Sequence, residues 1–132
     1  MGGMPEVAIP PGLPRPERLS LVLERDGAEC VWCRRPLALG DRYLSVEHVV
    51  PRLKGGPAWA ENEVPACRSC NRTRGHTAPS LWLDACEARG LRPNRAVITR
   101  ALVDLRGAIA TRGGQRRARP YLDAQLRRLW AG

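Results

Sequence analysis

Four cysteines in two pairs carry the clearest chemical signal in this chain. Two residues separate Cys30 from Cys33 and two separate Cys67 from Cys70, and 33 residues lie between the pairs. A two-residue gap lets both sulfurs of a tight turn reach one Zn²⁺ ion at about 2.3 Å, and two such turns complete a tetrahedron. A redox role fits less well, because neither pair opens a helix in a βαβ setting. The spacing therefore predicts one structural zinc site.

A second group of polar residues lies between and just after these pairs. Glu47 and His48 are adjacent in a segment of β-forming residues. Asn62 follows a glycine-rich loop, and Asn71 directly follows the second cysteine pair. Hydrolysis of a phosphodiester needs a base that activates water and a cation that neutralises the reacting phosphate. Histidine is the side chain that most often serves as such a base, so His48 suits this role. Glu47 and Asn71 offer oxygen ligands of the kind that Mg²⁺ accepts, and Asn62 can tie its loop to the backbone at His48.

Each of these residues also has a purely structural interpretation. His48 could be a buried strand histidine, Asn62 an ordinary loop residue, and Asn71 a helix cap, a role that asparagine favours. Neighbours on a strand point to opposite faces, so Glu47 and His48 cannot share one role. His76, just beyond the predicted helix after Cys70, is expected at the surface. Residue types alone leave these alternatives open.

Taken together, these residues resemble the HNH endonuclease family, the ββα-metal nucleases. The matching segment runs from Cys30 to Gly75: CxxC, then carboxylate-His-hydrophobic-x-Pro, two glycines, Asn, and CxxCN followed by a basic residue and Gly. The resemblance implies an α+β fold, a small zinc-stapled ββα-metal core with a helical C-terminal extension. It also implies His48 as general base, Asn62 as the residue that orients it, and Mg²⁺ or Mn²⁺ on Glu47 and Asn71.

Two positions depart from the usual pattern of that family. The acid before the histidine is often Asp, and Glu47 is one methylene longer. The usual Lys near the end of the helix is replaced by Arg74, which keeps the positive charge. We expect Arg72 and Arg74 to contact phosphates or the charge that develops during cleavage.

The net charge of +9 lies entirely in the C-terminal third of the chain. Residues 88–132 hold 11 arginines and two acidic residues, whereas residues 1–87 hold equal numbers of basic and acidic residues. Such a field attracts nucleic acid. Since phosphate contacts supply affinity without sequence choice, we expect Arg116, Arg117 and Arg119 to bind DNA. A solvated helix surface in an arginine-rich protein is the alternative.

Periodicity divides the chain into three parts. Residues 1–16, rich in Pro and Gly, are predicted to form a flexible arm. Residues 17–78 are predicted to form the nuclease core, with a helix up to Asp26-Gly27, strands over 43–50 and around Val64, and a helix from 68 to about 75. Residues 79–132 form a basic extension of three predicted helices, starting near Pro79, Asn94 and Pro120.

These observations favour a metal-dependent endonuclease that hydrolyses DNA, nicking one strand or cutting both, with a homodimer possible. A non-catalytic zinc module that binds nucleic acid is the main alternative, and an RNA-directed nuclease is a third. No long apolar run or signal-like start is present, so we expect no membrane span and a cytoplasmic location. Cysteine in a reducing compartment again favours zinc over disulfides.

Overall fold

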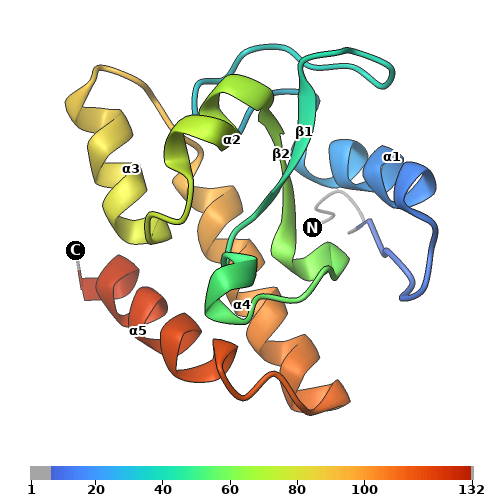
Figure 1. Ribbon diagram of the computed structural model, residues 1–132, viewed down its shortest axis with the longest axis vertical. Coiled ribbons are helices and arrows are strands. Elements are labelled where there is room, and N and C mark those ends of the chain that lie inside the picture. The colour runs from blue at the N-terminus through green and yellow to red at the C-terminus, as the bar shows by residue number, and fades with distance from the viewer. Residues whose placement is uncertain (1–6, 132) are drawn as a thin grey trace, which may run out of the picture.

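A two-stranded antiparallel hairpin forms the centre of the molecule. The computed structural model describes residues 7–131, so the first six residues of the predicted arm lie outside the described part. Strands β1 (Leu44–His48) and β2 (Glu63–Cys67) pair from Leu44↔Cys67 to His48↔Glu63. In Figure 1 the hairpin runs through the middle, with α1 on one side and α2 and α3 on the other.

Five α-helices surround the hairpin in the described part of the chain. They are α1 (Arg15–Asp26), α2 (Arg68–Arg74), α3 (Pro79–Ala88), α4 (Arg95–Arg112) and α5 (Ala118–Ala131). Helix α1 packs on β2, and α2 packs on both strands. Helix α4 packs on β2 and on α5, which also contacts α3. The predicted α+β class is confirmed, and none of the described helices is both long and apolar enough to cross a membrane.

Local sequence signals account for the helix ends. The Asn94 side chain accepts a hydrogen bond from Val97 N at 3.1 Å, which caps α4 as predicted. Pro79 occupies the first turn of α3, where its missing N–H costs nothing. Gly75, at φ +58°, ends α2 with a positive φ that glycine adopts without strain.

Some predicted bounds differ from the structure. Helix α1 begins at Arg15, inside the predicted arm, and α5 begins at Ala118, two residues before Pro120. The predicted strand over 43–50 is shorter: β1 ends at His48, and beyond it Val50 N bonds to the side chain of Asn62 instead of to backbone.

A single apolar core joins the hairpin to the C-terminal helices. The buried cluster contains Trp32 beside the first cysteine pair, Leu83 in α3, Leu102 in α4 and Leu126 in α5. The rings of Trp32 and Trp82 meet edge to face with centroids 6.5 Å apart. The α-helical extension therefore completes the core of the small hairpin, which has few apolar residues of its own.

Candidate active site

The four paired cysteines converge at one end of the hairpin. Cys30 and Cys33 lie in the turn before β1, Cys67 ends β2, and Cys70 lies in the first turn of α2. Their sulfur atoms all lie within 4.8 Å of one another, and Cys33 Sγ is 3.9 Å from Cys67 Sγ. A Zn²⁺ ion with four bonds of about 2.3 Å needs sulfurs about 3.8 Å apart. These cysteines are thus positioned to bind a metal ion such as zinc.

Cys86 lies apart from this metal-binding group. It is fully buried on α3, where burial, the main cause, raises the pKa of its thiol. This agrees with its interpretation as a small apolar residue of the core.

Asn62 fixes the backbone immediately after His48. Its side-chain oxygen accepts a hydrogen bond from Val50 N at 2.8 Å, and its amide nitrogen donates to Val50 O and Pro57 O at 3.0 Å. Its own carbonyl accepts from Val49 N. The sequence predicted a link to His48, and the structure places it one and two residues later. Asn62 is completely buried, so these bonds are shielded from water.

Gly56 allows this loop to close. A Cβ atom at position 56 would lie 1.8 Å from Val50 O and 2.8 Å from Asn62 Nδ2. Both distances are too short for any side chain. The backbone of the glycine-rich loop therefore reaches Val50 only because residue 56 lacks a side chain.

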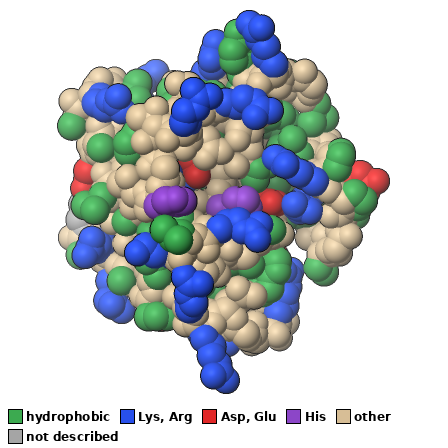
Figure 2. All heavy atoms as spheres, viewed as in Figure 1, with side chains coloured by type: hydrophobic (Ala, Val, Ile, Leu, Met, Phe, Trp, Pro, Cys, Tyr) green, Lys and Arg blue, Asp and Glu red, His purple; other side chains and the backbone are tan. Residues whose placement is uncertain are grey.

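His48 ends β1 with its imidazole partly exposed. The side chain is 25% exposed, and Nε2 lies 3.7 Å from Glu63 Oε2 across the hairpin. His48 and His76, the two histidines of the chain, are both visible on the face shown in Figure 2, with acidic side chains beside them and several Lys and Arg side chains on the same face. His48 is therefore within reach of a polyanion bound to this face.

Glu47 points the other way, into the core. Its carboxylate accepts hydrogen bonds from Trp32 Nε1 at 2.9 Å and from Arg74 Nη1 at 3.0 Å, and the residue is only 3% exposed. Burial, the main cause, raises the pKa of Glu47, although Arg74 and Trp32 oppose this effect. Alternation along β1 thus separates Glu47 from His48, as the sequence predicts.

Arg74 is a buried residue, although we expected it to contact DNA. It is 1% exposed, and Nη1 and Nη2 donate to His48 O at 2.8 Å and Val49 O at 2.7 Å, besides the bond to Glu47. Its Nε donates to Thr77 O at 2.9 Å. These bonds occupy all three nitrogens of the buried guanidinium, so in this conformation it holds the end of β1 and is not presented to a phosphate.

Asn71 joins α2 to β1. Its amide nitrogen donates to Ser45 Oγ at 2.6 Å and to Val46 O at 3.0 Å. The amide oxygen has no partner among the described residues and remains available as a ligand. Asn71 and Glu47 therefore differ as candidate metal ligands, because both oxygens of Glu47 are already engaged.

The predicted DNA-contacting arginines other than Arg74 are exposed. Arg72 lies on the outer side of α2, and Arg116, Arg117 and Arg119 lie at the turn before α5 or in its first turn. Arg117 donates to Leu53 O and packs against Gly55, a few residues beyond His48. The basic turn is therefore attached to the loop that follows the histidine.

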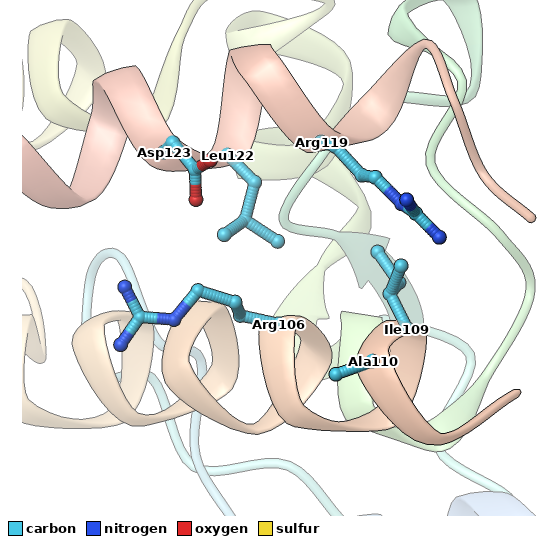
Figure 3. A pocket seen from close by; sticks show the side chains of 6 residues that line it. All are labelled: Arg106, Ile109, Ala110, Arg119, Leu122 and Asp123. Atoms are coloured by element: carbon cyan, nitrogen blue, oxygen red, sulfur yellow. The ribbon is translucent and has the colours of Figure 1, made fainter. Parts of the chain in front are cut away.

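A shallow groove between α4 and α5 is a separate feature (Figure 3). It is lined by Arg106, Ile109 and Ala110 of α4 and by Arg119, Leu122 and Asp123 of α5. No residue of the hairpin lines it, so it is not part of the His48 site.

Three residues of the site had been missed in the sequence: Trp32, Arg18 and Glu63. Arg18 donates to both oxygens of Glu63, at 2.5 and 3.1 Å, and Glu63 faces His48. In the hairpin, residue 48 pairs with residue 63. A prediction of this strand register would have identified Glu63 as the residue that faces His48.

Comparisons with known proteins address the same segment. Residues 30–77 match the family model described as HNH endonuclease, which confirms the resemblance seen in the motif. The chain is 28% identical over 76 residues to the CRISPR-associated endonuclease Cas9 of Corynebacterium diphtheriae. That match covers 57% of this chain but only 7% of the relative's length. No solved structure matches the chain significantly.

Proposed function

Because residues 30–77 match the HNH endonuclease model, we propose that the protein is an endonuclease that hydrolyses DNA phosphodiester bonds, with His48 as the general base. The observation that carries this proposal is the position of the imidazole, partly exposed at the end of β1 on a surface rich in Lys and Arg. Its backbone is held at and just after His48, by Arg74 through His48 O and by Asn62 through Val49 and Val50. A fixed base within reach of water is what the reaction needs.

The proposed reaction balances without any further reactant. His48 takes a proton from a water molecule, and the resulting hydroxide forms a bond to phosphorus while the bond from phosphorus to the 3′ oxygen breaks. The leaving oxygen takes a proton from solvent. The products are a 5′-phosphate and a 3′-hydroxyl, and since one site acts on one phosphodiester, a single chain is expected to nick.

The catalytic Mg²⁺ or Mn²⁺ expected on Glu47 and Asn71 fits this arrangement only in part. The free amide oxygen of Asn71 suits such an ion, whereas the buried carboxylate of Glu47 is bonded to Trp32 and Arg74. When bound, a divalent ion supplies charge stabilisation at the phosphate. The two predicted ligands do not form one ready site in this conformation, so no step is assigned to the ion.

DNA binding is proposed for the surface beside His48. Arg72, Arg116, Arg117 and Arg119 are exposed, and Arg117 contacts the loop beyond the histidine. Such residues bind phosphates without reading sequence.

Incubation of supercoiled plasmid with the zinc-loaded protein and Mg²⁺ or Mn²⁺ tests this function. We expect nicked plasmid from the wild type, none from His48→Ala, and unchanged activity from His76→Ala, which removes the other histidine. Plasmid that is bound but not cut by the wild type would favour the non-catalytic zinc module. Cleavage of RNA but not DNA would favour an RNA-directed nuclease.

A further inference from the structure

A buried carboxylate faces the proposed catalytic base from the opposite strand. Glu63 is the register partner of His48, and its Oε2 lies 3.7 Å from His48 Nε2. Nε2 is buried and has no hydrogen-bond partner within the described residues. Nδ1, the other ring nitrogen, is not a buried atom without a partner. A buried polar atom without a partner is costly, and the carboxylate of Glu63 is an acceptor that faces it.

Helix α1 holds that carboxylate in place. Arg18 donates to both oxygens of Glu63, at 2.5 and 3.1 Å, in the two-bond geometry that fixes a carboxylate most firmly. Arg25, two turns later, donates to Glu63 O at 2.6 Å and to Ala60 O at 3.0 Å. Both the side chain and the backbone of Glu63 are thus anchored by one helix.

Glu63 is ionised at neutral pH. Burial, the largest effect, raises its pKa, but the contacts with His48 and Arg18 together outweigh burial and lower the pKa of Glu63 to about 2. An ionised carboxylate accepts hydrogen bonds and donates none. The nitrogen that faces it must therefore carry the proton.

We propose that Glu63, held by Arg18, is a positioning residue that keeps the proton of neutral His48 on Nε2 and leaves Nδ1 unprotonated toward the attacking water. This inference rests on the proposed function of His48. A neutral imidazole carries one proton, so a proton fixed on Nε2 leaves a lone pair on Nδ1. When Nδ1 accepts the proton of water, the imidazolium that forms stays beside the negative charge of Glu63.

Glu47 cannot replace Glu63 in this role. It lies on the opposite face of β1, bonded to Trp32 and Arg74. Asn62 holds the backbone at Val49 and Val50, and Glu63 orients the ring. Two adjacent residues, Asn62 just before β2 and Glu63 at its start, thus position the base at two levels.

The substitution Glu63→Gln gives a sharp test. Because the Arg18 side chain can only donate hydrogen bonds, it will keep the amide oxygen of the glutamine as its acceptor. The amide NH₂ group then faces His48 Nε2. Because an NH₂ group also only donates, Nε2 must become the acceptor and the proton must move to Nδ1. The substitution is expected to invert the tautomer with almost no change in side-chain size.

Long-range ¹H–¹⁵N NMR of protein labelled at histidine reads the tautomer, about two pH units above the ordinary pKa of histidine. Because the chain has two histidines, the spectrum of His76→Ala assigns the NMR signals of both. We expect the Nε2–H form of His48 in the wild type and in Glu63→Asp, and the Nδ1–H form in Glu63→Gln. We also expect kcat for plasmid nicking to fall about 100-fold in Glu63→Gln with little change in KM. Glu61→Gln, the matched control, alters a nearby carboxylate that pairs with Arg112 and should change neither.

An unchanged tautomer in Glu63→Gln would overturn the inference, as would an Nδ1–H form in the wild type. If Glu63→Gln fails to fold, Glu63→Asp and the wild type still decide it, because an Nδ1–H form in either contradicts the role of the carboxylate. The NMR result does not depend on cleavage. Failure of the proposed function, seen as cutting by His48→Ala or none by the wild type, is therefore distinguishable from failure of this inference.

Discussion

Removal of the Arg74 charge should unfold the end of the hairpin that carries His48. Arg74 and Glu47 form an ion pair whose side chains are 0% and 4% exposed. In Arg74→Met the carboxylate of Glu47 would stay buried and, among the described residues, would keep the Trp32 donor alone. The carbonyls of His48 and Val49 would be left without their Arg74 donors.

The magnitude follows from the burial of the pair. Breaking a buried ion pair by removing one partner costs about 3–5 kcal/mol, because an uncompensated charge remains. Domains of this size are stable by about 5–15 kcal/mol, so Arg74→Met should lose a large part of the total. Burial already raises the pKa of Glu47 despite the contact with Arg74. The attraction within the pair therefore does not fully offset the cost of burying the carboxylate, and the pair adds little net stability to the fold. The double variant Glu47→Gln with Arg74→Met should therefore recover about 2 kcal/mol of the loss.

Urea unfolding followed by circular dichroism, at a fixed zinc concentration and without added Mg²⁺, measures these free energies. Two results would refute the reasoning: a cost below about 1 kcal/mol for Arg74→Met, or a double variant as unstable as the sum of the single variants. If Glu47 instead acts mainly as a metal ligand, Glu47→Gln will leave stability intact and raise the Mg²⁺ concentration needed for cleavage.

Three further outcomes are expected. The protein should contain one zinc ion per chain by elemental analysis, and Cys67→Ser or a chelator should unfold it; retention of structure without metal would contradict a structural zinc site. Since the folded pKa of Glu63, about 2, lies below its ordinary value of 4.5, its stabilisation is present above pH 4.5 and is lost as pH falls toward 2. The difference in unfolding free energy between wild type and Glu63→Gln, up to about 3 kcal/mol at neutral pH, should shrink over that range, and a constant difference would argue against the ion pair. Substitution of Arg116, Arg117 and Arg119 by Glu should weaken DNA binding and reduce the salt slope by about 0.9 for each phosphate that these side chains no longer neutralise, and an unchanged slope would remove the basic turn from the interface.

Spacing along the chain was enough to predict the local features. The two cysteine pairs each need only a tight turn, so their convergence on one metal followed from the sequence. The helix that ends at Gly75 and the cap at Asn94 depend on residues within one or two turns. Alternation on β1 likewise predicted that Glu47 and His48 point apart.

Only the tertiary structure decided which partners these side chains meet. Glu63 and Arg18 are 45 positions apart, and they meet because α1 packs on β2. Arg74 is basic and lies on a short helix, which made an exposed phosphate contact plausible, yet packing of α2 on β1 buries it against Glu47. Periodicity reports which residues share a face of one element, but burial and ion pairing depend on the element that covers that face.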